Sequence, residues 1–455
     1  MVLGKRGVQR GVARFAFGGV VRRLLPLLLL AWGATARGQA PAATSATRAA
    51  ELERTAAFAL DEYQWFHAHP ELANQERETA ARMATALEAM GFEVWRGVGG
   101  TGVVATLQGE KPGPRVTVLY RADMDALPVT EETGLAYRSQ APGVMHACGH
   151  DLHLATALGA LRTLASTRAE WSGTILFIAQ PAEEVSGGAK QMLADPTFRK
   201  IVARTGKPRV ALAVHDAAEL PAGHVAVSAG PTTANVDSID LTLYGRDGHG
   251  AKPQLTVDPI VMAAEVVMQL QTIVSRRIPP EADAVVTVGK IAAGTTYNVI
   301  PASAELLLTV RSYDDDTRRM LLGEIEHIAH SVARSYHAPT PPKVNVRKDF
   351  TPAGVNDEAW SSRLRSRFEA LLGKDRVVPI PPSMGGDDFA RFGRELAIPT
   401  VYWRLGAVPL PAYAQRATKP LPSLHSATWA PDARTALPVG IQTSVAALRE
   451  GLSAP

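Results

Sequence analysis

Three short apolar segments, separated by segments with helical patterning, constrain the fold of this chain most. Residues 116–120 (VTVLY), 174–179 (TILFIA) and 210–214 (VALAV) are almost entirely apolar, with many β-branched side chains. Strands of this kind are buried on both faces, as in a sheet covered by helices. A helix is predicted over residues 152–164, between the first two strands. This order predicts an α/β domain built in layers.

Further segments extend this domain. The spacing of apolar residues predicts helices over 50–66 and 75–90, the second ending at Gly91. Residues 102–107 are expected to form another strand. A length of 455 residues exceeds the roughly 100–200 residues of a typical domain, so we expect two domains.

The pattern changes near Gly230. Residues 238–244 alternate apolar and polar side chains, which is typical of a half-exposed antiparallel strand. The following segments are predicted as helix 259–276, strand 284–291, strand 304–311, helix 317–336 and strand 343–346. The order β-α-β-β-α-β predicts a ferredoxin-like unit. Because α/β patterning then resumes, we predict that this unit, residues 231–347, is inserted between two parts of the first domain, 45–230 and 348–455.

The first 40 residues have the pattern of an export signal. Arg22 and Arg23 precede an apolar run over residues 24–32, and small residues follow. A membrane span needs about 20 apolar residues, so the run is too short to anchor the chain. The alternative is an ordinary basic tail. We predict cleavage near residue 37 or 41, a periplasmic or secreted location, and no membrane attachment after cleavage.

The charge balance depends on this segment. Residues 1–40 carry seven basic residues and no acidic residue, so the net charge of +4 falls to −3 without them. A mildly acidic mature protein has no electrostatic reason to bind nucleic acid. We therefore expect no nucleic-acid partner.

One short stretch concentrates groups that bind metals. Within eight residues the chain places His146, Cys148, His150, Asp151 and His153. Thiolate sulfur and imidazole nitrogen are ligands that suit zinc and its neighbours in the transition series. A lone histidine or cysteine is usually structural, but three histidines beside the only cysteine, where a strand gives way to a helix, predict a metal site.

Other candidate ligands lie at the ends of strands. Glu183 and Glu184 follow the strand at 174–179, where one could bind metal while the other acts as a general base. Taken alone, the pair could equally be a solvated surface pair, and His215 or His425 could each be an ordinary histidine. Together, five residues suit two metal ions that share one bridging group: Cys148, His150, Glu184, His215 and His425.

Eight motifs occur in order along residues 50–450. They are HAHPEL at 67–72, RADMDALP at 121–128, HACGHD at 146–151, QPAEE at 180–184, GHGA at 248–251, NVIP at 298–301, MGGDDF at 384–389 and LHS at 424–426. On these motifs the chain resembles the M20 metallopeptidase and aminoacylase family. Its amidohydrolase branch, which includes hippurate hydrolases, N-acyl-amino-acid hydrolases and auxin-conjugate hydrolases, is the most similar.

The resemblance implies a role for each matching residue. The five residues grouped above match the ligands of two divalent metal ions, zinc first, with manganese, cobalt or nickel as alternatives. Cys148 stands where many relatives have a bridging aspartate. Glu183 matches the general base, and Asp125 matches a carboxylate that orients a ligand histidine.

The resemblance also implies a mixed-sheet, three-layer catalytic domain with the inserted unit acting as a lid and forming a homodimer. His249 matches a lid histidine that reaches the scissile carbonyl of the partner subunit. Asn298 and Arg311 match contacts to the substrate carboxylate. Two positions depart from the branch: Gln254 stands where a histidine is usual, and Asp387 replaces a glutamate.

Three functions remain open at this point. The first is hydrolysis of N-acyl amino acids, and the second is carboxypeptidase or dipeptidase action by the same chemistry. The third is an inactive metal-binding or amino-acid-binding protein. Glu183 argues against the third, because a binding protein needs ligands but no general base.

Overall fold

The computed structural model describes residues 45–453. The export segment predicted over residues 1–40 lies outside the described residues. Within residues 45–453, no helix combines the length and the apolar character that crossing a membrane requires.

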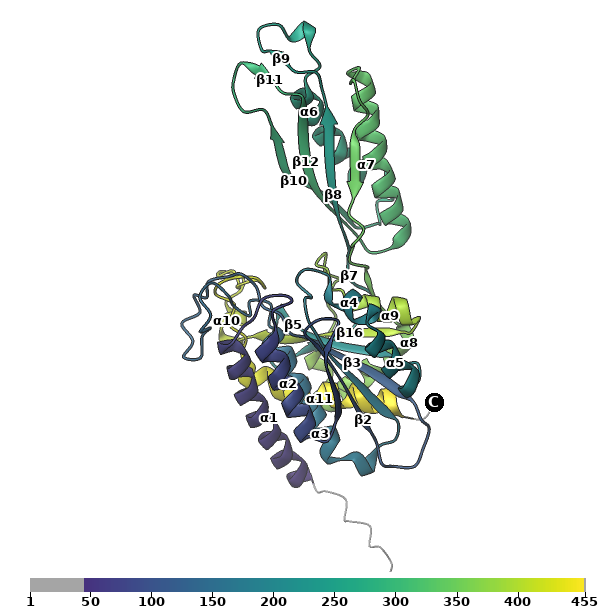
Figure 1. Cartoon of the computed structure of the whole chain (residues 1–455). Helices are drawn as coiled ribbons and strands as arrows, with labels where there is room; N and C mark the ends of the chain where they lie inside the picture. The colour runs from purple at the N-terminus through teal and green to yellow at the C-terminus, as the bar shows by residue number, and fades with distance from the viewer. Residues whose placement is uncertain (1–44, 454–455) are drawn as a thin grey trace, which may run out of the picture. The chain divides into compact units, whose positions relative to one another are not determined.

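An eight-stranded mixed sheet forms the larger part of the fold (Figure 1). Its strands, in spatial order, are β1 (Glu93–Val98), β2 (Gly102–Gln108), β4 (Thr174–Gln180), β3 (Thr117–Asp123), β5 (Ala211–Pro221), β16 (Thr400–Val408), β6 (Val225–Ala226) and β15 (Val377–Val378). β3 runs parallel to β4 and β5, and β16 runs parallel to β5, whereas β1 and β2 are antiparallel. The predicted mixed α/β sheet is confirmed.

Helices cover both faces of this sheet. Alternate residues of the central strands face opposite cores, for example Tyr120 on one side and Leu119 on the other. The first core also receives α1 (Ser45–Ala68), α2 (Arg77–Ala89), α3 (His150–Ser166), α8 (Glu358–Leu372) and α11 (Ala433–Leu452). The second core receives α4 (Gly188–Ala194), α5 (Pro196–Thr205) and α9 (Ala390–Leu396). The central strands are therefore apolar on both faces because both faces are buried.

A second sheet follows β7 (Gly230–Thr233), which pairs with β14 (Gly354–Asn356). This sheet has the order β10-β12-β8-β13 and is entirely antiparallel. Its elements along the chain are β8 (Asn235–Tyr244), α6 (Pro259–Arg276), β10 (Ala284–Ala293), β12 (Ser303–Ser312), α7 (Asp315–Ser335) and β13 (Lys343–Val346). They follow the predicted β-α-β-β-α-β order. α6 and α7 bury Met262 and Ile325 with Leu241 and Leu306 of the sheet, which gives this segment a core of its own.

Short elements complete the structure. They are β9 (Gly248–His249), β11 (Val299–Ile300), α10 (Leu410–Ala414) and 3-10 helices at Arg168–Glu170, Pro253–Leu255 and Lys374–Arg376.

Two strands extend beyond their predicted ends, in both cases into charged residues. β3 continues through Arg121 and Asp123, because these side chains are paired with each other in the interior. β5 continues through His215 and Asp216, both of which are buried. Charged residues often end a strand because they face water. Here they are buried and have partners in the interior, so the two strands continue through them.

Candidate metal centre

The candidate site lies where parallel strands β3, β4 and β5 run toward the same edge of the sheet. Asp125 and Glu183 follow β3 and β4, and His215 lies in β5. Helix α3 begins at this edge with His150, two residues after Cys148. Ligand sites in such sheets form at the carboxyl ends of the strands, so the topology alone brings these residues together.

Cys148, Glu184 and His425 form one group of possible ligands. One donor atom from each lies within 4.8 Å of the other two. The Glu184 Oε1 to His425 Nε2 distance is 3.6 Å. The His425 N–H donates to the carbonyl of Ala147, which ties this distant loop to the cysteine segment. His425 has φ of +67°, a strained conformation of the kind that clusters at functional sites.

His215 and His150 also lie close to this group. His215 Nε2 is 3.7 Å from Cys148 Sγ, while its Nδ1 lies 2.8 Å from the carbonyl of Asp216. A donor hydrogen on Nδ1 leaves Nε2 free to bind a metal. His150 Nδ1 similarly lies 3.5 Å from Asp125 Oδ1, and its Nε2 faces Glu184 Oε1 at 3.8 Å.

The spacing of these atoms fits metal ions. The N···O distances of 3.6 Å and 3.8 Å from Glu184 to His425 and His150 exceed the usual hydrogen-bond range of about 2.7–3.2 Å. Tetrahedral ligation with bonds of about 2.0–2.3 Å places ligand atoms about 3.3–3.8 Å apart. Among the described side chains, both nitrogens of His150 and Oε1 of Glu184 are buried without a hydrogen-bond partner. Buried polar atoms are nearly always satisfied, and a cation between Nε2 of His150 and Oε1 of Glu184 would satisfy those two atoms.

The electrostatics point the same way. Burial raises the pKa of Glu183 well above its usual range, and the neighbouring carboxylates of Asp387 and Glu184 raise it further. Burial also raises the pKa of the Cys148 thiol. A nearby divalent cation would lower both pKa values, because it favours the carboxylate and the thiolate over the neutral acids. The residues present therefore fit a metal centre.

Asp125 holds the loop that carries the two glutamates. Its carboxylate accepts the N–H of Glu183 at 3.0 Å and the N–H of Glu184 at 2.9 Å. The same carboxylate faces Nδ1 of His150. Asp125 thus lies where the predicted orienting carboxylate belongs, and it touches the glutamate pair as well.

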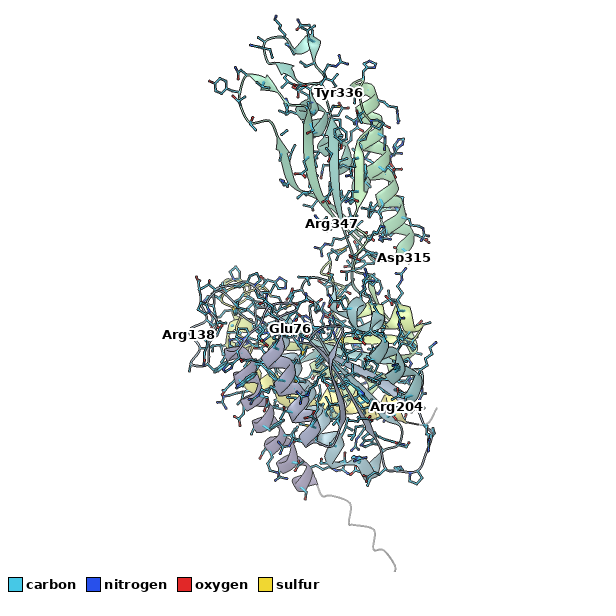
Figure 2. The ribbon with its side chains drawn as sticks, viewed as in Figure 1. Glu76, Arg138, Arg204, Asp315, Tyr336 and Arg347 are labelled. Atoms are coloured by element: carbon cyan, nitrogen blue, oxygen red, sulfur yellow. The ribbon has the colours of Figure 1, made fainter. Side chains whose placement is uncertain are left out.

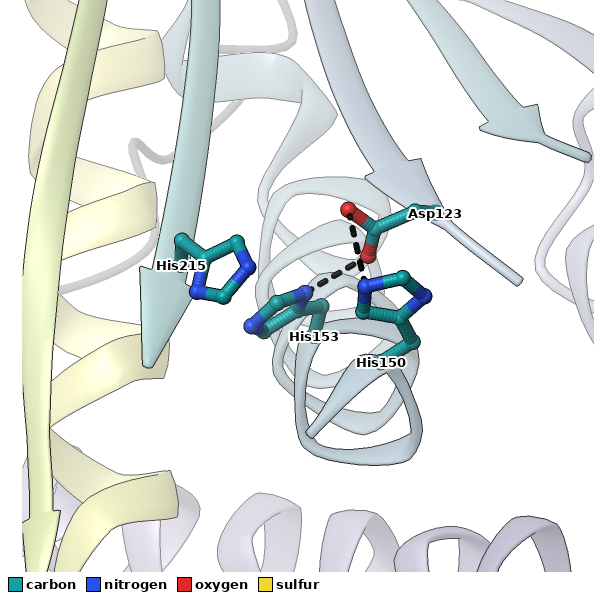
Figure 3. A group of neighbouring side chains, drawn as sticks. All are labelled: Asp123, His150, His153 and His215. Carbon is teal, nitrogen blue, oxygen red and sulfur yellow. Dashed lines mark hydrogen bonds and ion pairs between the residues drawn. The ribbon is translucent and has the colours of Figure 1, made fainter. Parts of the chain in front are cut away.

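Asp123 and His153 lie beside His150 and His215 (Figure 3). His153 Nδ1 lies 2.6 Å from Asp123 Oδ1, and its Nε2 accepts the N–H of Asp216 at 2.9 Å. Both nitrogens of His153 therefore have partners among the protein groups. Trp429 Nε1 donates to Asp216 at 3.2 Å.

Asp123 and Asp216 were given no role from the sequence, and His153 was counted only among the metal-binding groups of residues 146–153. Signals for them exist in the sequence. Asp123 and Asp125 are two residues apart on an extended segment, so they share one face. His150 and His153 are three apart on a helix and are also neighbours.

Asp387, which departs from the family motif, belongs to a buried ion pair. Its Oδ1 accepts from Arg121 Nη2 at 2.9 Å and from the N–H of Phe389 at 2.8 Å. Arg121 also donates to Gln180 at 2.8 Å. Through Arg121, Asp387 is linked to Gln180, which lies three residues before Glu183 in the chain.

The remaining predicted site residues lie on the second sheet and its hairpin. His249 is exposed and pairs in register with Val299, and its Nδ1 accepts the N–H of Ala251. Asn298 is also exposed, and its carbonyl accepts the N–H of Gly250 at 2.8 Å. Arg311 is half-buried and donates from Nη1 to the carbonyl of Met384 at 2.9 Å. None of the three belongs to the Cys148 cluster, which we define as Cys148, His150, Glu183, Glu184, His215 and His425.

The profile described as "Peptidase family M20/M25/M40" matches residues 119–427. The chain belongs to this family. N-acetylcysteine deacetylase of Bacillus subtilis is 36% identical over 331 residues, which are 72% of this chain and 83% of the relative. Thermostable carboxypeptidase 1 of Saccharolobus solfataricus is 35% identical over 343 residues, 75% of this chain and 83% of the relative.

A solved structure is also similar. The YxeP protein of Bacillus subtilis, described as a dinuclear metal binding peptidase from the M20 family, superposes with a TM-score of 0.71 at 29% identity. The match covers 88% of this chain and 99% of that structure. This M20 chain is therefore an enzyme of the amidohydrolase and peptidase type, and the span that matches the family includes every residue of the Cys148 cluster.

Proposed function

We propose that this M20 enzyme hydrolyses an amide bond in N-acyl amino acids or small peptides, using two divalent metal ions. The observation that carries the proposal is the convergence of donor atoms from Cys148, Glu184 and His425, with the buried carboxylate of Glu183 beside them. A metal ligand set without a general base would serve binding alone. The adjacent Glu183 gives the site the means for hydrolysis.

We assign one ion to Glu184 and His425 and the other to His150 and His215, with Cys148 shared between them. Bound there, the ions would polarise the substrate carbonyl and lower the pKa of a water. Thiolate, imidazole and carboxylate ligands favour zinc, with manganese, cobalt and nickel as alternatives. Elemental analysis of the purified protein, with activity after reloading each metal, tests this assignment.

Glu183 is the general base in this proposal. It takes a proton from the attacking water and delivers it to the leaving amine. Asp125 fixes its backbone, and burial keeps bulk water away from its carboxylate.

We propose that residues 231–347 form a lid and the interface of a homodimer. His249 of one subunit would then stabilise the developing negative charge on the carbonyl oxygen in the other subunit. Asn298 and Arg311 would bind the substrate carboxylate. Arg311 suits this role, because a guanidinium has five donors and the bond to Met384 uses one.

Cross-subunit complementation tests the dimer. Glu183→Gln and His249→Ala would each be inactive alone, but a mixed dimer would contain one site with an intact Glu183 and an intact partner His249. Co-expression is expected to restore activity, and light scattering is expected to report a dimer at micromolar concentration. A fully active monomer, or no recovery in a demonstrated mixed dimer, would overturn the proposal.

We also propose that residues 1–40 act as an export signal and are removed. The basic, apolar and small-residue regions of this segment support this. N-terminal sequencing of protein recovered from its host is expected to give a start near residue 37 or 41. Recovery of the intact segment on protein inside the cell would contradict it.

The choice between substrates rests on the two relatives, one a deacetylase and one a carboxypeptidase. A panel of N-acetyl amino acids, N-benzoyl amino acids and dipeptides, run with the metal-loaded enzyme, separates the two activities. We expect the N-acyl amino acids to be hydrolysed fastest. If every substrate stays intact with every metal while calorimetry detects amino-acid binding, the protein is a binding protein on this scaffold.

A further inference from the structure

Hydrogen bonds from three consecutive backbone N–H groups, those of residues 182–184, hold the loop that contains Glu183. The N–H groups of Glu183 and Glu184 donate to Asp125, as described above. The N–H of Ala182 donates to a different carboxylate, Oε1 of Glu76, at 2.8 Å. The loop is therefore held by two buried carboxylates, and only one of them, Asp125, belongs to the motif predicted for this site.

Ala182 needs this support because of its backbone conformation. It has φ of +51°, which a residue with a side chain rarely adopts, and it is fully buried. Its carbonyl closes a tight turn by accepting from Gly187 and Gly188. Such a conformation persists only when the surroundings fix it, and it sets the direction in which the next residue, Glu183, leaves the turn.

Glu76, which is labelled in Figure 2, is fully buried, and its carboxylate joins three separate segments. Besides Ala182, its carboxylate accepts from the N–H of Asn74 at 2.9 Å and from the hydroxyl of Thr101 at 2.5 Å. All three donors are neutral. Burying a carboxylate is costly, so a carboxylate with only neutral donors calls for an explanation.

Capping of helix α2 does not explain why the carboxylate of Glu76 is buried. Glu76 occupies the position before helix α2, where a carboxylate commonly caps the free N–H groups of the first turn. Its side chain makes no such capping hydrogen bond. Those N–H groups are served by Glu71, which accepts from Glu78 at 3.1 Å and from Thr79 at 2.9 Å. Glu76 instead turns toward the loop of the general base.

We propose that Glu76 is a positioning residue for catalysis, which acts through Ala182 to aim the carboxylate of Glu183. This inference rests on the proposed role of Glu183 as general base. Glu76 lies outside the span that matches the family profile and touches none of the five candidate ligands in the contacts described above. Its loss should therefore change turnover without removing metal.

The kinetic test compares Glu76→Ala with Glu76→Gln and with the control Glu71→Ala. A misplacement of about 1 Å can cost about 100-fold in rate, so Glu76→Ala should lower kcat by up to that factor with KM and metal content unchanged. Glu76→Gln keeps an acceptor oxygen for Ala182 and should recover most of the activity. Glu71→Ala loosens the same helix start and should lower Tm while kcat stays normal.

Hydrogen exchange provides a readout that needs no activity. Without its acceptor, the amide of Ala182 should exchange about threefold to tenfold faster in Glu76→Ala, measured by mass spectrometry on a peptide spanning 181–185. Glu71→Ala should leave that peptide unchanged. If Glu76→Ala does not fold, Thr101→Val, which removes one donor to the same carboxylate, should show a smaller change of the same kind.

The outcomes separate this inference from the proposed function. Unchanged exchange at 181–185 in Glu76→Ala, or an equal loss of kcat in Glu71→Ala, would overturn the positioning role. A loss of metal in Glu76→Ala would overturn it as well. A wild-type enzyme that hydrolyses no substrate would overturn the proposed function, while the exchange measurement would still decide whether Glu76 holds the loop.

Discussion

The Cys148 cluster and the His249 hairpin differ in how firmly the fold holds them. His150 and Glu183 in the cluster are buried, and both contact neighbours that set their orientation. His249 lies exposed on a two-residue strand, with its ring bonded only within its own loop among the contacts described above. A firmly held site can be ready before substrate arrives. The hairpin would need another surface, such as a partner subunit, to hold its histidine in place.

The largest expected effect lies in the cluster. Glu183→Gln keeps the size of the side chain but removes the base, so turnover should fall by about 10²–10⁴-fold while the metal stays bound. The matched control is its neighbour: Glu184→Gln should lose metal, because a neutral amide is a poor ligand for a dication. Near-normal turnover in Glu183→Gln, or metal loss equal to that of Glu184→Gln, would reverse the two assignments.

The hairpin should show a loss of rate without a loss of stability. His249→Ala should lower kcat by about 10²–10³-fold, the usual cost of removing a group that stabilises an oxyanion. Tm and metal content should not change, because the side chain is exposed. Lys252→Ala, in the same loop, is the control and should keep normal kinetics. Equal kinetics in both variants would show that the hairpin takes no part in the reaction.

The proposed role of Cys148 as a ligand shared by two ions can be tested through metal affinity. A hydroxyl rarely ionises where a thiol does, so Cys148→Ser should weaken metal binding by at least about 10–100-fold. Titration with a competing chelator measures this directly. If Cys148 bridges two ions, both stoichiometric steps should weaken. If only one step changes, the cysteine serves a single ion.

The smallest effect concerns a buried charge beside the cluster. Burial alone would lower the pKa of His67, but hydrogen bonds to Asp151 at 2.6 Å and Glu131 at 3.2 Å raise it to about 9. The folded state therefore holds a proton that the unfolded chain releases near pH 6.5. This stabilisation is complete below pH 6.5 and is lost as the pH rises through about 9, with a total on the order of 3 kcal/mol.

Urea unfolding between pH 6 and pH 10 measures that change. In His67→Gln the slope over this interval should disappear. The exposed pair of Lys290 and Glu305 on the second sheet is the comparison, and Lys290→Ala should change the free energy of unfolding by less than about 1 kcal/mol. A pH slope that survives in His67→Gln would assign the effect to another group.

Much of the fold could be predicted from the sequence because burial leaves a clear pattern. Residues 116–120 and 174–179 are almost entirely apolar, so their place in the centre of a covered sheet follows from composition. Asp123 and Asp216 were missed because charged residues usually end a strand, whereas here ionic partners allow the strand to continue into the interior. Their role depends on contacts across the sheet, which a linear pattern does not contain.

The site shows the same limit. The five candidate ligands were named from residue type and motif, and the structure brings them to one end of the sheet. Glu76 carried no such signal, because its partner Ala182 lies 106 residues away and is bound through its backbone. Backbone contacts of this kind do not depend on the partner's side chain, so the sequence does not reveal them.

The bond between His425 and Ala147 has a consequence for the order of events during synthesis. The cluster cannot close until the chain has been made as far as His425, whereas the four strands of the second sheet all lie within residues 235–346. Chains grow at roughly 5–20 residues per second, so roughly tens of seconds pass between the synthesis of Cys148 and that of His425. We therefore expect metal uptake to be a late step, after residue 425 has been made. A nascent chain stalled before residue 424 should resist protease over 235–346 yet retain no metal.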